Sequence, residues 1–214
     1  MKDDDTKNSN NFYLVILLIT AAAVILIVAW RSNIFLTPYE RYYAGDVRHF
    51  RGNLVEAAKV SVNPDELSLI NVLLNPEVYR IKIAFFPNDT ENSYYFASSF
   101  EITNKLSIIF RNILGENVTT FKTEDGSSCL LFPNNQIRCF ISVPINSTEE
   151  ISPTSSEPTI LLLGPSHADA TLVSVNGFLI TAEGESFDET DRKYNDLDLA
   201  VDKMIIVLMD YTST

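Results

Sequence analysis

The chain has very few residues of the types that bind metals or carry out redox chemistry. It contains two cysteines, Cys129 and Cys139, and two histidines, His49 and His167. A structural zinc site needs four ligands, so the lack of a second cysteine pair argues against zinc. Nine residues separate the cysteines, unlike the Cys-x-x-Cys arrangement that lowers a thiol pKa, which argues against a redox role. We therefore predict no metal and no cofactor, and we assign no catalytic residue.

Basic residues are also scarce relative to acidic ones. The chain has 16 Lys and Arg against 28 Asp and Glu, which gives a formal net charge of −12. Because such a surface repels the phosphate backbones of DNA and RNA, we predict that the protein does not bind nucleic acid.

Long apolar runs are absent apart from one near the start of the chain. Residues Phe12 to Trp30 form a run of nineteen uncharged, mostly branched-aliphatic residues. At about 1.5 Å per residue, a helix of this length spans roughly 28 Å, close to the thickness of about 30 Å of a bilayer's hydrocarbon core. This run predicts one transmembrane helix, with the lipid bilayer as its partner.

A cleaved signal peptide is the alternative interpretation of this run. The alanines from Ala21 to Ala23 resemble the small residues that precede a cleavage site. The apolar run nevertheless continues to Ala29, and the leader carries three acids, Asp3 to Asp5, where a signal peptide is cationic. We therefore favour an uncleaved anchor.

The charges beside the anchor and the features of the following domain predict opposite orientations. Two lysines precede the anchor and four arginines follow it closely, which by the positive-inside rule would leave the domain in the cytoplasm. The cysteine pair and three Asn-x-Thr acceptor sequons, at Asn88, Asn117 and Asn146, favour an exterior domain. Because long domains translocate largely regardless of flanking charge, we predict a single-pass protein of the cell membrane with an exterior, glycosylated C-terminal domain.

Composition divides the chain into an anchor region and one domain. We predict a polar leader over residues 1–11, the transmembrane helix over 12–30, a juxtamembrane stalk over 31–62, an α/β domain over 63–209 and a tail over 210–214. Within the domain, residues 144–158 are dominated by Ser, Thr, Pro and Glu and contain only two isoleucines. That stretch predicts a mobile surface loop.

The domain has the pattern of an α/β fold with a mixed sheet, two β-hairpins and a C-terminal helix. Apolar runs over Val78–Phe86 and Thr159–Leu163 predict buried strands, and the apolar stripe over Ser93–Leu114 predicts an amphipathic helix that joins two strands. Asn176-Gly177 predicts the turn of a hairpin formed by residues 171–175 and 178–182. The remaining predicted elements are a short helix between Asn63 and Asn75, a strand from Val118 to Thr123 and a final helix from Thr190 to Met209.

The other predicted hairpin carries the cysteines. Its strands are residues 129–132 and 137–143, joined by a turn rich in Pro and Asn. If the loop has three residues centred on Asn134, Cys129 and Cys139 lie directly opposite one another, at a separation that a cross-strand disulfide spans. We predict a disulfide between them if the domain is exterior, and two inert thiols are the alternative.

Two polar loops predict a ligand site. Pro87–Asn92 and Gly164–Asp169 each follow the carboxyl end of an apolar strand, and in open α/β sheets ligands bind outside those ends. If the two strands are neighbours, the loops converge near a helix start that could receive an anion. Glycosylation of Asn88 would block this site. The residues expected to converge are Asn88, Asp89, Ser166, His167 and Asp169.

The second of these loops also contains the residue types of a hydrolytic triad. Ser166, His167 and Asp169 lie within four residues. A triad needs groups that converge from separate elements, which neighbours in one tight loop rarely achieve. The simpler interpretation is a loop whose Ser and Asp bond to nearby backbone amides, so hydrolysis at residues 164–169 is kept only as an alternative.

A run of acidic residues lies between Glu183 and Asp202. Its spacing differs from the alternating ligands and central glycine of an EF-hand loop, which argues against calcium binding. Because carboxylates suit the positive end of a helix dipole, we interpret the run as the solvated start of the C-terminal helix.

Three phrases of the sequence occur in an order that is shared with a known group of proteins. They are Ile83–Asn92, Leu162–Ser166 and Asp196–Lys203. In this order the chain resembles uncharacterised archaeal-type single-pass membrane proteins that have no assigned activity. The resemblance covers most of residues 40–209 and implies a membrane-anchored domain, and it carries over no functional residue.

Together these features predict a non-enzymatic module that binds a small ligand or a partner protein at the membrane exterior. The basis is the lack of any catalytic or metal-binding constellation in the sequence. A subunit of a larger membrane assembly is one alternative, and a hydrolase acting at residues 164–169 is the other.

Overall fold

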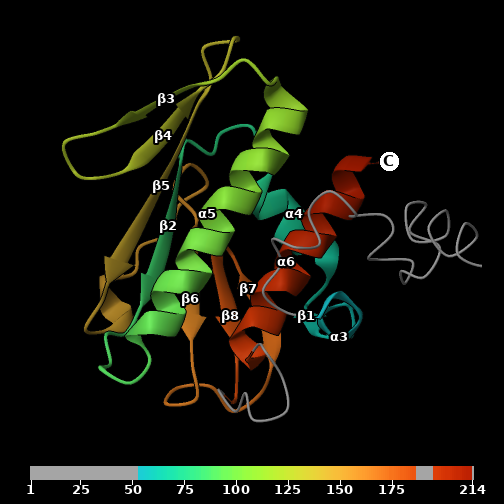
Figure 1. Ribbon diagram of the computed structural model, residues 1–214, viewed down its shortest axis with the longest axis vertical. Coiled ribbons are helices and arrows are strands. Elements are labelled where there is room, and N and C mark those ends of the chain that lie inside the picture. Colours follow the sequence, from blue (N-terminus) through green and yellow to red (C-terminus); the bar gives the residue numbers. More distant parts are fainter. Residues whose placement is uncertain (1–52, 187–194, 214) are drawn as a thin grey trace, which may run out of the picture. The chain divides into compact units, whose positions relative to one another are not determined.

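The computed structural model describes residues 53–186 and 195–213 of the chain (Figure 1). Within these ranges, no helix combines the length and the apolar character that crossing a membrane requires. The predicted anchor, Phe12 to Trp30, lies outside the described residues, as do the leader and most of the predicted stalk.

The described residues form an α/β domain around one mixed, eight-stranded sheet (Figure 1). The strand bounds are Ser61–Asn63 (β1), Arg80–Phe85 (β2), Thr119–Lys122 (β3), Ser128–Leu131 (β4), Ile137–Pro144 (β5), Thr159–Leu163 (β6), Leu172–Asn176 (β7) and Leu179–Glu183 (β8). The strand order is β1-β7-β8-β6-β2-β5-β4-β3. The four central strands, β8, β6, β2 and β5, run parallel to one another, while β7 pairs antiparallel with β8 and β4 pairs antiparallel with β5. This confirms the predicted class of fold.

The middle of the sheet is covered on both faces, as its apolar composition requires. Along β2, Ile81, Ile83 and Phe85 are buried on one face, and Ala84 is buried on the other. A strand with apolar side chains on both faces needs a cover on each of them. The prediction that the strands at residues 78–86 and 159–163 are buried is therefore confirmed.

Two long helices, α5 (Asn92–Leu114) and α6 (Asp196–Ser213), lie side by side over one face of the sheet (Figure 1). One face of α5 is buried, formed by Tyr95, Ile102, Leu106, Ile109 and Phe110, whereas Phe96, Phe100 and Ile113 are exposed. The Tyr95 ring stacks on Phe85 of β2 with 5.4 Å between ring centroids. Two shorter helices, α3 (Leu54–Ala57) and α4 (Glu66–Leu73), pack against α6. The helices thus form one layer on one side of the sheet.

The other face of the sheet is covered by the segment that joins β5 to β6. Its two isoleucines, Ile145 and Ile151, pack with Ala84 and Leu161 of the sheet, and a short 3₁₀ helix, η2 (Thr148–Glu150), lies between them. Residues 144–158, which the sequence predicts to be a mobile surface loop, are therefore packed on the sheet.

Charge pairing holds the end of the same segment. Glu157 forms ion pairs with Arg80 at 3.3 Å and with Lys82 at 3.1 Å, and its carboxylate also accepts a hydrogen bond from the hydroxyl of Tyr79. These contacts lower the pKa of Glu157, most strongly through the hydrogen bond from Tyr79. The basic side chains that β2 presents on this face are thereby neutralised.

Two predictions about the order of elements are corrected by the strand pairing. The predicted stalk reaches residue 62, whereas α3 and β1 already belong to the domain, because β1 pairs with β7. The strand predicted at residues 118–123 to follow the helix is β3, which pairs with β4 at the sheet edge, whereas β5 is the parallel neighbour of β2 on that side. Both β1 and β3 are short and polar, so neither has the apolar run that marks a central strand.

Both predicted hairpins are confirmed. In the hairpin of β4 and β5, Cys129 pairs with Cys139 in the expected register, and the two form a disulfide. In the hairpin of β7 and β8, Asn176 pairs with Leu179, so the two central residues of the turn are Gly177 and Phe178 and not the predicted Asn176 and Gly177. Gly177 has a φ of +59°, as the first central residue of such a turn requires.

The start of α6 is buried, which corrects the prediction of a solvated acidic helix start. The backbone N–H of Asp198 donates to Asn195 Oδ1 at 2.8 Å, and the N–H of Asn195 donates to Asp198 Oδ2 at 3.2 Å. This reciprocal pair is a capping box, in which side chains satisfy the free amides of the first turn. Asp196, Asp198 and Asp202 are all buried.

Gly184 lets the end of β8 approach this first turn closely. Its N–H donates to the carbonyl of Leu163 at 2.9 Å, and a Cβ added to it would lie 2.2 Å from the backbone nitrogen of Leu197. A contact this short with backbone cannot be relieved by a rotamer change. The position therefore requires glycine for steric reasons.

We expect Gly184→Ala to lower the free energy of unfolding by about 3 kcal/mol or more, because α6 must shift away from the sheet. Thermal or denaturant unfolding of the two proteins would measure the change. Gly177→Ala is the matched control, since its Cβ would meet no atom within 4 Å and only left-handed strain of about 1–2 kcal/mol is added. A smaller loss for Gly184→Ala than for Gly177→Ala would contradict the described packing of α6.

Candidate functional site

The loops after β2 and β6 meet where the direction of the chain through the sheet reverses. From β2 the chain continues through α5 to β5 on one side, and from β6 it continues to β8 on the other side. Because β2 and β6 are parallel neighbours, their carboxyl ends lie at the same edge. Such a topological switch point is where open α/β sheets form ligand crevices.

The structure brings together two of the predicted site residues, Asn88 and Ser166. Asn88 Nδ2 donates to Ser166 Oγ at 3.1 Å. Asn88 Oδ1 accepts from the N–H and the hydroxyl of Thr90, at 3.1 and 2.9 Å, which holds the first loop in a tight turn. The predicted convergence of the two loops is therefore confirmed for this pair, and ligand binding there stays a prediction.

Glu91 is the central residue of this contact, although the sequence analysis did not single it out. It is only 4 % exposed. Its Oε1 accepts from the N–H and the hydroxyl of Ser166, at 3.1 and 2.5 Å, and its Oε2 accepts from the hydroxyl of Tyr95 at 2.5 Å. The spacing of four residues between Glu91 and Tyr95 on a helix is the only signal of this contact in the sequence.

Tyr95 completes the connection between the two loops. Its hydroxyl accepts from the N–H of Gly164 at 3.0 Å while it donates to Glu91. Burial raises the pKa of Tyr95, and the hydrogen bond to Glu91 raises it further, so the hydroxyl stays protonated. The residues Asn88, Glu91, Tyr95 and Ser166 thus hold the two loops in fixed positions.

The other predicted site residues, Asp89, His167 and Asp169, are exposed beside this network. The ring of His167 stacks on Phe86 with 4.7 Å between centroids. Asp169 lies near Glu183, whose pKa is raised first by burial and then by the charge of Asp169. Exposed side chains on a fixed backbone can reach an incoming partner.

The described contacts do not form a Ser-His-Asp triad. Ser166 Oγ donates to the Glu91 carboxylate, and the His167 ring is stacked on Phe86, so no histidine contacts the serine hydroxyl among these contacts. A triad needs the histidine to accept the serine proton.

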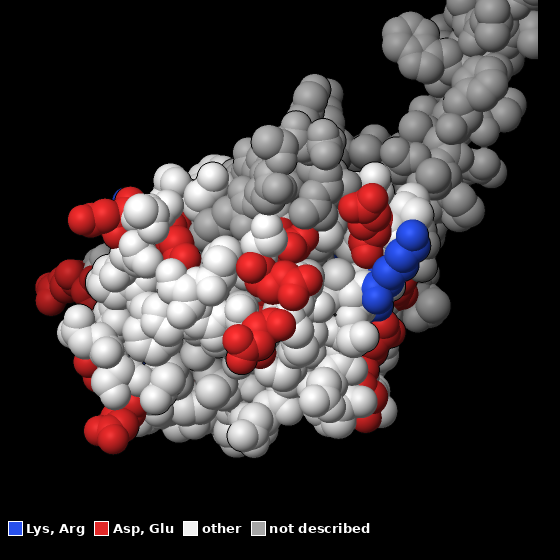
Figure 2. Space-filling view, turned by 90° about the horizontal axis from the view of Figure 1, so that it is seen from below, with Lys and Arg blue, Asp and Glu red and all other residues white. Residues whose placement is uncertain are grey.

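The edge that carries these loops is acidic. The described parts of the segments that follow β2, β5, β6 and β8 are residues 86–91, 145–158, 164–171 and 184–186, and none of these residues is Lys or Arg. The connection after β8 continues through residues 187–194, outside the described residues, and its sequence there includes Arg192 and Lys193. Figure 2 shows this edge from below, with many acidic side chains and little basic charge. The sequence suggested that the start of α5 could receive an anion, but the residue at that start, Glu91, already carries a buried carboxylate, so an anionic ligand is not favoured there. The exposed acids of this edge are Asp89, Glu149, Glu150, Asp169 and Glu185.

No metal site accompanies these acids among the residues that the structure describes. Within residues 53–186 and 195–213, no group of three or more His, Cys, Asp or Glu side chains is arranged to hold a metal ion.

The comparisons with known proteins identify no relative. No family model, no curated protein and no solved structure matches this chain. The site must therefore be interpreted from its own geometry.

The sequons differ in how accessible their asparagines are. Asn117 and Asn146 are exposed, whereas Asn88 is partly buried and its amide nitrogen donates to Ser166. A glycan on Asn88 would have to be accommodated against the second loop. The geometry therefore favours Asn117 and Asn146 as acceptors over Asn88.

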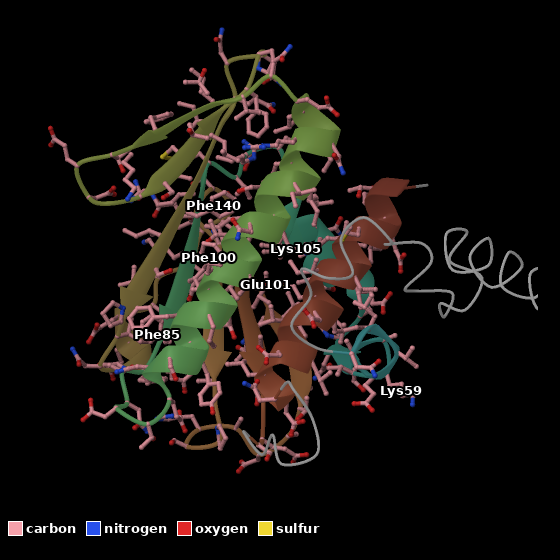
Figure 3. All side chains as sticks on the ribbon, in the orientation of Figure 1. Lys59, Phe85, Phe100, Glu101, Lys105 and Phe140 are labelled. Carbon is pink, nitrogen blue, oxygen red and sulfur yellow. A yellow bond between two sulfur atoms is a disulfide. The ribbon has the colours of Figure 1, made fainter. Side chains whose placement is uncertain are left out.

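A groove that the sequence did not predict runs beside α5. It has a volume of about 480 Å³ and lies between α5 and the strands β4 and β5. Phe96 and Phe100 of α5 are 58 % and 69 % exposed at its rim. Figure 3 shows Phe100 on α5 and Phe140 on β5, the two elements that form its walls.

We expect Glu183→Gln to raise the melting temperature at pH 7 and to have little effect at pH 4. The folded-state pKa of Glu183 is raised above 4.5, so its ionised form destabilises the fold, and this cost is present only above that pKa. Because the group is partly exposed, we expect the gain to be less than about 1 kcal/mol. Unfolding curves at both pH values would measure it.

Glu185→Gln is the matched control, since Glu185 is exposed on the same edge and carries the same charge. If Glu183→Gln raises the melting temperature equally at both pH values, or lowers it at pH 7, the ionised Glu183 side chain does not destabilise the fold.

Proposed function

We propose that this chain is a membrane-anchored, exterior-facing module that binds a positively charged ligand or partner segment at the acidic carboxyl edge of its sheet. The observation that carries the proposal is that four connecting segments meet at this edge without one Lys or Arg among their described residues. Acids of one sign that lie close together on a rigid edge attract cations and raise their rate of association.

The loop network supports this function because it fixes the position of the acids. Asp89 precedes the buried Glu91 by two residues, and Asp169 follows Ser166 by three. Since Glu91 and Ser166 hold one another, the backbone that carries Asp89 and Asp169 need not be ordered when a partner binds. A smaller entropic cost of ordering means a higher affinity for the same contacts.

The disulfide between Cys129 and Cys139 supports the exterior location. Disulfides persist in oxidising compartments and are rare in the cytosol of most cells. The anchor at Phe12 to Trp30 and the resemblance to archaeal-type single-pass membrane proteins are predictions from the sequence that agree with this location.

For the topology, we expect a native protein with glycans at Asn117 and Asn146, with none at Asn88, and with an intact disulfide. Intact mass would rise by about two units on reduction, as two thiols replace one disulfide. Asn117→Gln and Asn146→Gln should each remove glycan mass, while Asn88→Gln should remove none. A bare polypeptide with free thiols would instead place the domain in the cytoplasm.

For binding, we expect the full chain in lipid nanodiscs to bind a hexalysine peptide and to reject a hexaglutamate peptide. The triple variant Asp89→Asn, Asp169→Asn, Glu185→Gln should weaken hexalysine binding about tenfold at low salt, because each exposed charge contributes up to about 1 kcal/mol. Calorimetry at low and high salt would measure this.

The matched control is a second triple variant with the same change in net charge, built from three exposed acids outside the edge. These are Glu77→Gln, Glu116→Gln and Glu124→Gln. If both triple variants weaken binding equally, the total charge attracts the peptide and the edge is not a site.

A subunit of a larger assembly is the second candidate, and the groove beside α5 favours it. The structure supports self-association as the form of this assembly. β3 is the last strand at its end of the sheet, and Phe121 of β3 lines a second, adjoining groove of about 260 Å³. Two copies could then pair edge strands while they cover the aromatic groove. A native mass of one chain in nanodiscs would exclude this arrangement, and Phe100→Glu should convert a dimer into monomers.

A further inference from the structure

Arg138 is a buried cation without a carboxylate partner. It lies on β5 and is 5 % exposed. Its Nη1 donates to the carbonyl of Ile137 at 3.0 Å, and its Nη2 donates to the carbonyl of Pro76 at 3.2 Å. The guanidinium also lies over the Phe110 ring, 5.5 Å from its centroid. Among the described contacts of Arg138, none is an ion pair, although buried charges are normally paired.

A small cavity adjoins this guanidinium. It has a volume of about 150 Å³ and lies between the ends of α4 and α5 and the start of β5. Its walls are largely apolar, and Phe110, Ile113 and Leu114 of α5 supply much of them. Arg138 and Gln136 are its polar residues.

Two residues that line this cavity each have a buried polar atom without a hydrogen-bond partner among the described residues. These atoms are Arg138 Nε, a donor, and Gln136 Oε1, an acceptor. Leaving such a group unpaired costs about 1–3 kcal/mol, and more when the group is charged. Burial also lowers the pKa of Arg138, as is expected for a buried cation that has no anion beside it.

We propose that this cavity binds a small organic carboxylate with a compact apolar body. The guanidinium of Arg138, which lines the cavity, would form a charge-assisted contact with the carboxylate, and the carboxylate would supply the missing negative charge. The apolar body would lie against Phe110, Ile113 and Leu114.

The size of the cavity limits the ligand. A cavity of about 150 Å³ holds one benzene ring. A simple aromatic or branched aliphatic acid therefore fits, and a longer ligand would have to project past Ile113, which is 47 % exposed. Inorganic anions would leave the apolar walls uncovered.

This site is independent of the acidic edge. The cavity and the acidic edge lie at opposite ends of α5, a helix of 23 residues. Either proposal can therefore fail alone.

The test uses 4-fluorobenzoate as the probe and the full chain in lipid nanodiscs, with ¹⁹F NMR line broadening as the readout. We expect binding with a Kd of about 1 mM or tighter. We expect 4-fluorobenzyl alcohol, which keeps the ring and lacks the charge, to bind at least about tenfold more weakly. Fluoroacetate, which keeps the charge and lacks the ring, should also bind more weakly.

Two variants assign the binding to the cavity. Ile113→Trp should fill the cavity from its exposed side and weaken binding at least about tenfold, because it removes the space for the ring. Arg138→Gln should do the same by removing the charge. Leu67→Trp is the matched control, since Leu67 is 58 % exposed and does not line the cavity. This variant should bind 4-fluorobenzoate as tightly as the unchanged chain does.

Three results would overturn the proposal. They are no broadening up to about 10 mM probe, equal affinity of the acid and the alcohol, and undiminished binding by Ile113→Trp. If Arg138→Gln does not fold, the comparison of acid with alcohol and the Ile113→Trp variant still decide the outcome.

Discussion

The parallel register of β8, β6, β2 and β5 is the constraint on which the rest of the structure depends. It places the carboxyl ends of these four strands at one edge of the sheet. From β2 the chain goes on to strands on one side, and from β6 it goes on to strands on the other side, so the loops after β2 and β6 lie next to each other. The buried contact of Glu91 with Ser166 is possible only because Lys82 to Phe85 and Thr159 to Leu162 are in register. Acids that are scattered along the sequence thereby gather on one surface.

Those parts of the fold that depend on local chemistry could be predicted from the sequence. Gly177 marks the β7–β8 hairpin, although the turn is centred one residue later than the Asn-Gly pair predicts, and the loop length between Cys129 and Cys139 specifies the register that allows their disulfide. The convergence of Asn88 with Ser166 was also predictable, because a rule about parallel strands relates the two loops without knowledge of their detailed packing.

The parts that depend on distant partners could not be predicted. Glu91 looks like an ordinary loop acid until Ser166 is placed beside it, 75 residues away. The two isoleucines of residues 144–158 look too few to order a segment, yet Ala84 is so small that Ile145 and Ile151 can pack over it. β1 and β3 have no apolar run, because each lies at an edge where the sheet needs fewer buried side chains.

The central strands also separate charge between the two faces near their starts. Arg80 and Lys82, on the face away from the helices, are neutralised by Glu157 and Asp125, whereas Arg138 on the helix face has only carbonyl groups and a ring. A buried guanidinium that served stability alone would be expected to gain from a carboxylate beside it or from replacement by an apolar side chain. Arg138 has no carboxylate beside it, and its position is not occupied by an apolar residue. A cavity lies next to it that is also lined by Gln136, whose Oε1 is an unpaired acceptor. Its position is therefore better explained by a ligand that brings the charge than by folding.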